Sequence, residues 1–126
     1  MGSSIINIGK KDTRDRREYS KRRYKEKRKT EIGQLEVLDK YLKSTFNISL
    51  FEYNELFTKQ NGCCAICKKH QTEFKKRLAV DHCHKTGKIR GLLCATCNTA
   101  LGQFKDLISN LKEAIIYLEN HGEKDE

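Results

Sequence analysis

Apolar positions recur at helical spacing in the stretch that precedes the first cysteines. Residues 50–57 carry their apolar side chains at this spacing, and Ser49 and Glu52 match the capping-box pattern that starts a helix. The dipeptide Asn61-Gly62 then ends the run. The chain contains no proline, so glycines and capping residues mark the boundaries of its elements. The pattern therefore predicts a short amphipathic helix just before the cysteines.

Two further stretches have the composition or the pattern of helices. Residues from about 12 to 41 are rich in Arg, Lys, Glu and Leu, which favour helix, and Gly33 is the one expected interruption. Near the C-terminus a single apolar stripe ends at Gly122, and we expect it to pack in the core. This stripe consists of Ile108, Leu111, Ile115 and Leu118.

Between these helices the pattern changes to that of a β-hairpin. From Leu78 to Cys94 the sequence reads LAVDHCHKTGKIRGLLC, in which two short apolar segments flank a turn at Gly87. A brief helix is expected from Asn98 to Phe104. Helices combined with one hairpin predict the α+β fold class.

The chain is long enough for one domain but has little apolar material. It has 126 residues, 34% of them charged, and a mean hydropathy of -0.78, so we expect a small core that a metal or cross-links must support. Neither a signal peptide between Met1 and Lys10 nor a transmembrane segment is visible, which favours a cytoplasmic location. In that reducing compartment, cysteines bind metal more often than they bind each other.

Four of the six cysteines form two pairs with the spacing of metal ligands. Two residues separate the members of each pair, so that their thiolates can converge on one tetrahedral ion. Four sulfurs leave no open position for water, and the pattern therefore predicts a structural zinc, with two chance pairs or a redox pair as the alternatives. The predicted ligands are Cys64, Cys67, Cys94 and Cys97. Cys63 could compete with Cys64, and Cys83 could hold a second metal together with His82 and His84, but neighbours on a strand point to opposite faces and both cysteines are expected to be bystanders.

Polar side chains on the predicted hairpin and helix offer the groups that phosphodiester hydrolysis needs. The reaction requires a base for water, a cation at the phosphate oxygens and support for the leaving oxygen. His82 has the imidazole of a general base, whereas Asp81 and Asn98 carry the hard oxygen donors that Mg²⁺ prefers. On a regular strand Asp81 faces away from His82 and His84, unless a bulge re-aims them.

The hairpin and the cysteine motifs together resemble a known family. The segments QNGCCAIC and VDHCHKTGKIRGLLCATCNTALG are similar to the recombination endonuclease VII family of phages, which belongs to the His-Me finger or HNH nucleases. The resemblance covers about residues 53–118. It implies a zinc-bound ββα-metal unit that is flanked by helices and holds one catalytic Mg²⁺ or Mn²⁺.

The resemblance also implies roles for individual residues. Asp81 and Asn98 would hold the catalytic metal, His82 would be the general base, and His84 would lie near the scissile phosphate or its leaving oxygen. Cys83 stands where the family often has an acidic residue, at a position expected to be peripheral to the metal. The predicted organisation is a basic helical arm (residues 1–48), a nuclease domain (49–122) and a frayed tail (123–126).

Nearly all of the net charge of +9 falls between Lys10 and Lys29. A basic block of this density attracts a polyanion, so DNA is the expected partner. RNA and an acidic membrane surface are alternative partners. The block could also be a solvated helix or a disordered tail that binds nothing. The predicted phosphate contacts are Arg14, Arg16, Arg17, Lys21, Arg22, Arg23, Lys25, Lys27, Arg28 and Arg90.

These features together predict a divalent-metal-dependent DNA endonuclease that does not bind membranes and acts in the cytoplasm. If the gene belongs to a phage, this is the cytoplasm of the host cell. A non-catalytic zinc-bound module that binds DNA or RNA is the alternative. A homodimer is also open, because two subunits could pair through the final helix and through Leu35, Leu38 and Leu42.

Overall fold

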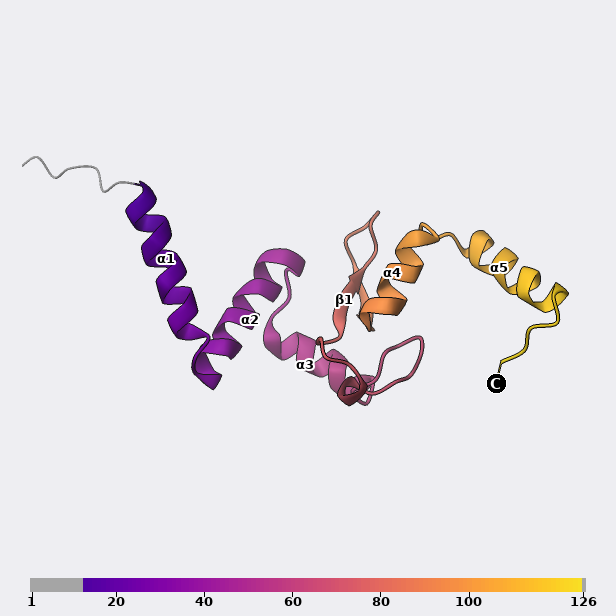
Figure 1. The fold of residues 1–126 in the computed structure, drawn as a ribbon, viewed down its shortest axis with the longest axis horizontal. Coiled ribbons are helices and arrows are strands. Elements are labelled where there is room, and N and C mark those ends of the chain that lie inside the picture. The colour runs from indigo at the N-terminus through magenta and orange to yellow at the C-terminus, as the bar shows by residue number, and fades with distance from the viewer. Residues whose placement is uncertain (1–12, 126) are drawn as a thin grey trace, which may run out of the picture. The chain divides into compact units, whose positions relative to one another are not determined.

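The computed structural model describes residues 13–125 of the chain (Figure 1). Residues 1–12 and 126 include the start of the predicted arm and the end of the predicted tail, and they lie outside the described residues. The described part is a mixed α+β protein with five α-helices, one short 3-10 helix and one two-stranded sheet. The chain divides into two compact units, Met1–Leu50 and Phe51–Glu126, while the predicted division into arm, nuclease domain and tail stays a prediction.

The first unit contains two helices that pack against each other, α1 (Thr13–Lys27) and α2 (Glu31–Phe46). The helix breaks before Gly33, because Thr30 starts α2 as its N-cap and accepts a hydrogen bond from the Gly33 backbone N–H at 3.0 Å. The predicted interruption at Gly33 is therefore wrong by three residues. A Cβ atom on Gly33 would lie 1.9 Å from the Lys27 carbonyl oxygen, so only glycine fits where the two helices meet.

The predicted amphipathic helix is confirmed as α3 (Leu50–Lys59). It ends where Asn61 and Gly62 adopt left-handed φ angles of 53° and 70°. Tyr53 is buried, and its hydroxyl donates a hydrogen bond of 2.6 Å to the Leu78 carbonyl oxygen. This bond joins α3 to the residue that precedes the hairpin.

The predicted hairpin is confirmed as the antiparallel strands β1 (Ala79–His82) and β2 (Ile89–Leu93). Gly87 makes the turn with a φ of 71°, a conformation that glycine adopts without strain. Asp81 pairs with Gly91 but His82 pairs with Ile89, so Arg90 is an extra residue in β2. The hairpin therefore contains a β-bulge beside Asp81 and His82.

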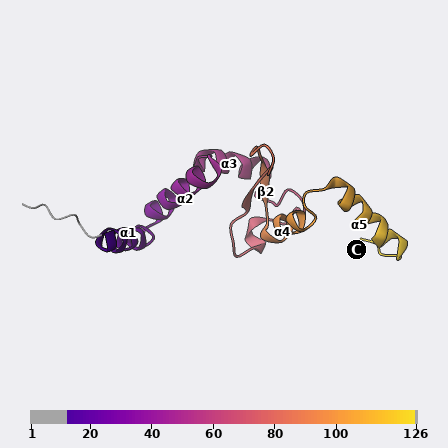
Figure 2. The same ribbon diagram turned by 90° about the horizontal axis from the view of Figure 1, so that it is seen from above.

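A 3-10 helix, η1 (Gln71–Glu73), precedes the hairpin, and helix α4 (Ala95–Gln103) follows it. Helix α4 begins three residues earlier than expected, because the Cys94 sulfur caps it by accepting a hydrogen bond from the Cys97 backbone N–H. Asn98 thus lies inside the helix. Helix α4 packs against both strands, as two views of the ribbon show (Figures 1 and 2).

The last helix, α5 (Ile108–Asn120), forms as predicted but does not pack as predicted. None of its residues is buried, and Ile108, Ile115 and Leu118 are 69%, 56% and 51% exposed. The expectation that its apolar stripe is ordinary core packing is therefore wrong. The sequence of a helix defines its apolar side, but burial of that side needs another surface that faces it. Here the small core lies around the hairpin.

The core of the second unit is small and lies around the hairpin. Leu78, Val80, Leu92 and Leu93 are its buried aliphatic residues. Leu42, one of the leucines that left a homodimer open, is also buried, together with Ile48, within residues 13–50. None of the helices in the described part of the chain combines the length and apolar character that a membrane crossing needs.

Candidate functional site

The four predicted zinc ligands lie together in the structure. Their sulfur atoms are all within 4.8 Å of one another, and the sulfurs of Cys67 and Cys94 are 3.9 Å apart. Four sulfurs at about 2.3 Å from a tetrahedral ion lie about 3.8 Å from each other. The donor set and its spacing therefore fit a structural zinc. This site joins the segment after α3 to the start of α4.

Backbone hydrogen bonds shape both halves of the zinc site. On the first half, the Cys64 N–H donates to the Lys69 carbonyl oxygen at 2.9 Å, the Lys68 N–H donates to the Cys64 carbonyl oxygen at 3.0 Å, and Lys68 has a left-handed φ of 63°. On the second half, the Cys97 N–H donates to the Cys94 sulfur at 3.4 Å. The first half is thus a tight turn and the second is the start of α4, and each brings two sulfurs close together.

The local environment already favours one thiolate in this cluster. Burial opposes the ionisation of Cys64, but backbone N–H groups from Cys94, Cys67 and Ile66 outweigh it and lower the pKa of Cys64 to about 6. Burial and the neighbouring Cys94 thiol raise the pKa of Cys97 to about 12. Zinc binding requires thiolates, and the lowered pKa of Cys64 favours this form.

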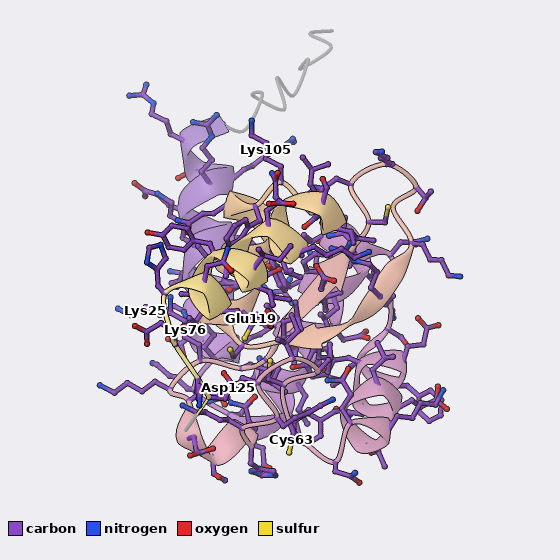
Figure 3. The ribbon with its side chains drawn as sticks, turned by 90° about the vertical axis from the view of Figure 1, so that its right-hand side faces the viewer. Lys25, Cys63, Lys76, Lys105, Glu119 and Asp125 are labelled. Carbon is purple, nitrogen blue, oxygen red and sulfur yellow. The ribbon has the colours of Figure 1, made fainter. Side chains whose placement is uncertain are left out.

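The two remaining cysteines are outside the four-sulfur cluster. Cys63, labelled in Figure 3, is half-buried, and its sulfur lies 3.4 Å from the Asn61 carbonyl oxygen. Cys83 is half-buried in the hairpin turn, where hydrogen bonds from Thr86 and the Lys85 backbone lower its pKa to about 7.

The hairpin and α4 bring the predicted catalytic residues into one region. Asp81 and His82 end β1, and Asp81 is buried with 8% of its surface exposed. His84 follows in the turn and is exposed, with its ring centre 4.9 Å from that of His82. Asn98 is half-buried near the start of α4, which packs against β1.

Arg90 lies in this region and is already paired. Its Nε donates to Asp81 Oδ2 at 2.7 Å, and its Nη2 donates to Asp81 Oδ1 at 2.9 Å. The same Nη2 donates to Asp106 Oδ2 at 3.3 Å. Asp106 Oδ2 in turn lies 4.0 Å from His84 Nε2. Two carboxylates therefore share one guanidinium at the edge of the candidate site.

Sequence reasoning missed Asp106. This residue lies in the turn between α4 and α5, where Lys105 and Asp106 have left-handed φ angles of 54° and 55°. It reaches Arg90 across a sequence separation of 16 residues. No local pattern marks such a contact, because it depends on how the turn after α4 returns towards the hairpin.

The other predicted phosphate contacts lie in the first unit. Eight are in α1, Arg28 follows directly after it, and all nine are exposed. Some already have partners, since Lys27 forms a 2.8 Å ion pair with Glu36. The guanidinium groups of Arg22 and Arg23 lie 5.9 Å and 5.8 Å from the ring centre of Tyr19.

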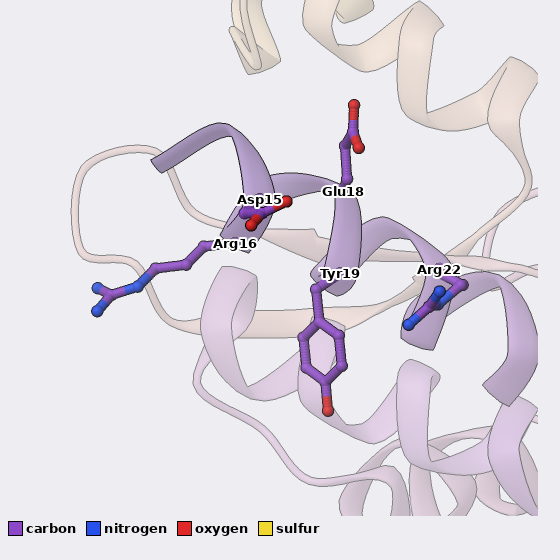
Figure 4. Close-up of a pocket in the computed structure, with 5 residues that line it drawn as sticks. All are labelled: Asp15, Arg16, Glu18, Tyr19 and Arg22. Atoms are coloured by element: carbon purple, nitrogen blue, oxygen red, sulfur yellow. The ribbon is translucent and has the colours of Figure 1, made fainter. Parts of the chain in front are cut away.

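Two hollows adjoin this basic surface. One, of about 450 Å³, is lined by Asp15, Arg16, Glu18, Tyr19 and Arg22, and Tyr19 and Glu18 point to opposite sides of α1 (Figure 4). The other, of about 750 Å³, lies between α1 and α2, and the tyrosines among its lining residues are Tyr19, Tyr24 and Tyr41. Aromatic rings between basic side chains are typical of surfaces that bind nucleic acid.

The sequence of this chain matches that of a known family over most of its length. The profile of the family described as recombination endonuclease VII matches residues 39–120. This range includes the four clustered cysteines, the hairpin, α4 and α5. The chain belongs to the recombination endonuclease VII family.

Two phage proteins are similar to this member of the endonuclease VII family. The Gene 59 protein of Mycobacterium phage L5 is 47% identical over 78 residues, which are 61% of this chain and 47% of that protein. The Gene 59 protein of Mycobacterium phage D29 is 46% identical over 76 residues, 60% of this chain and 46% of that protein. The aligned part thus spans about half the length of these relatives.

Two of the predicted site residues carry oxygen donors of the kind that a harder cation prefers. Asp81 is a buried carboxylate that already has a cation as its partner, namely Arg90. The amide of Asn98 offers an oxygen from the adjoining helix. Carboxylate and amide oxygens are ligands for Mg²⁺ and Mn²⁺, whereas the four cysteines suit zinc.

Proposed function

We propose that this protein is a divalent-metal-dependent DNA endonuclease with a His-Me finger active site. Membership of the endonuclease VII family supports nuclease activity. One observation supports the dependence on a metal. Helix α4, with Asn98 near its start, packs against the strand that ends in Asp81 and His82. The order of two strands and a helix in this region supports a ββα-metal unit.

The roles of the side chains follow from their chemistry and position. His82 accepts a proton from the water that attacks phosphorus, as a half-buried imidazole at a strand end is able to do. The P–O3′ bond breaks, and the product keeps its phosphate on the 5′ side. His84 is exposed beside His82, which suits a contact with the scissile phosphate or the leaving oxygen.

Asp81 and Asn98 are the residues that would hold the catalytic cation. A Mg²⁺ or Mn²⁺ ion there would supply positive charge that stabilises the developing charge on the leaving 3′ oxygen. A zinc ion held by the four cysteines would have a different role, because it would fix the start of α4, and hence Asn98, beside the hairpin.

The basic surface of α1 would hold DNA in place by contacts with phosphate groups. Its exposed arginines and lysines would contact phosphate groups, which position the substrate without reading its sequence. The phage relatives support the host cytoplasm as the place of action.

Plasmid cleavage by purified, zinc-loaded protein tests the proposed function. We expect conversion of supercoiled DNA in Mg²⁺ or Mn²⁺, none in EDTA, and a loss of at least about a hundredfold in rate for His82→Ala. His121→Ala is the matched control, since His121 is exposed directly after α5, where its ring lies tilted against that of Tyr117 with ring centres 4.6 Å apart. Zinc content is measured in all three proteins.

Two outcomes separate the endonuclease from its alternative. Cleavage by wild type and by His121→Ala, but not by His82→Ala with equal zinc content, supports the proposal. If wild type binds DNA tightly but cuts neither supercoiled, branched nor single-stranded DNA or RNA, the protein is a non-catalytic zinc-bound binding module. One observation favours that alternative, namely that Arg90 already donates to both carboxylate oxygens of Asp81.

A further inference from the structure

The carboxylate of Asp81 has an internal cation as its partner. Arg90 donates to both of its oxygens, at 2.7 Å and 2.9 Å, and only 10% of the Asp81 side chain is exposed. A buried carboxylate without a partner is strongly unfavourable. Arg90 therefore supplies that partner and orients the Asp81 side chain in the protein without a catalytic metal.

Arg90 also has a second acceptor within reach. Its Nη2 lies 3.3 Å from Asp106 Oδ2, and the Asp106 side chain is 23% exposed. The longer distance and greater exposure make this the weaker of the two pairs. If the Arg90 guanidinium leaves Asp81, it can therefore remain paired with the Asp106 carboxylate close by.

A divalent ion and Arg90 compete for the same oxygens. Asp81 has two carboxylate oxygens, and the guanidinium donates to each of them. An ion bound there would also stand close to a fixed positive charge, and like charges in a buried region repel each other strongly. Binding of the ion is therefore most favourable when Arg90 moves away.

We propose that Arg90 is an exchangeable counterion of Asp81, which leaves Asp81 for Asp106 and substrate phosphate when the catalytic cation binds. This inference rests on the proposed role of Asp81 as a metal ligand. It makes Arg90 a positioning residue that lowers metal affinity in the absence of DNA. Because phosphate draws Arg90 away from Asp81, DNA and the divalent ion bind with positive cooperativity, and each raises the affinity for the other.

Mn²⁺ titration of the zinc-loaded full chain, followed by the electron paramagnetic resonance signal of free Mn²⁺, tests the proposal without any cleavage. We expect Arg90→Gln to bind Mn²⁺ at least about tenfold more tightly than wild type. Lys88→Gln is the matched control, because it removes one charge from the same hairpin but leaves the Asp81–Arg90 pair in place. Its affinity should stay within about twofold of wild type.

Asp106→Asn provides a second test that leaves the Asp81–Arg90 pair intact. Without its alternative acceptor, Arg90 should remain on Asp81 and weaken Mn²⁺ binding. In the Arg90→Gln background the same change should have little effect, whereas a general loss of negative charge would weaken binding equally in both backgrounds. This double-mutant cycle therefore measures the exchange itself.

The possible results separate this inference from the proposed function. If Arg90→Gln binds Mn²⁺ no more tightly than wild type while Asp81→Asn abolishes binding, the counterion exchange is wrong but Asp81 remains a metal ligand. If Asp81→Asn binds Mn²⁺ as wild type does, the metal-ligand assignment and the exchange both fall. Tighter binding by Arg90→Gln, lost again in the Arg90→Gln/Asp81→Asn double variant, supports the exchange.

Discussion

The side chain of Gln60 completes the hydrogen bonding of a buried strand, and its removal provides a sharp test of what holds the second unit together. Its Nε2 donates to the carbonyl oxygens of Cys63 and Leu92 at 2.8 Å and 2.9 Å. Its Oε1 accepts from the Leu92 backbone N–H at 2.9 Å. Leu92 is fully buried. The amide thus takes the place of a neighbouring strand and joins the end of α3 to β2.

The cost of Gln60→Ala follows from which groups lose their partners. The Leu92 N–H loses its acceptor in a buried position, which costs about 1–3 kcal/mol. The Leu92 carbonyl oxygen keeps a bond from the Ala65 N–H at 3.2 Å, and Cys63 is half-buried, so these two losses together add only about 1 kcal/mol. We expect a total destabilisation of about 2–4 kcal/mol, or a fall in Tm of roughly 10–25 °C for a unit of this size.

Thermal unfolding at saturating zinc, followed by circular dichroism, measures this effect. Gln103→Ala is the matched control, because Gln103 is exposed at the end of α4 and its loss should change stability by less than about 0.5 kcal/mol. Denaturant unfolding should give the same ranking. If Gln60→Ala is as stable as Gln103→Ala, water satisfies the Leu92 N–H and the reasoning is refuted.

Three further predictions concern the metal, a buried hydroxyl and the basic surface. Cys64→Ser should lower zinc content from one ion per chain towards none and unfold the second unit, as metal analysis and circular dichroism would show; unchanged zinc would contradict the four-sulfur site. Tyr53→Phe removes the 2.6 Å bond to Leu78 and should cost about 1–2 kcal/mol in denaturant unfolding. Burial raises the pKa of Tyr53 to about 12, so its contribution is present below about pH 10 and is lost as the pH rises towards 12, a loss that Tyr53→Phe should not show. Arg22→Ala with Arg23→Ala should weaken DNA binding and reduce the slope of log affinity against log salt by about 1.8; an unchanged slope would place both side chains away from phosphate.

Several elements follow from local signals in the amino-acid sequence. Each Cys-x-x-Cys spacing marked one pair of metal ligands, and the glycine turn at Gly87 marked the hairpin, because both signals depend on residues a few positions apart. The same motifs carried the family resemblance, which the match over residues 39–120 confirms. Helical spacing likewise predicted α3 and α5.

Which distant groups meet, and which surfaces are covered, depends on the tertiary fold. Arg90 reaches Asp81 and Asp106 through a bulge in β2 and a turn after α4, and Gln60 reaches Leu92 across 32 residues. The stripe of α5 has the pattern of a buried helix but lies exposed. Spacing within a segment fixes which side chains share a face, because backbone geometry repeats locally. What that face contacts depends on the relative placement of segments, which no local pattern encodes.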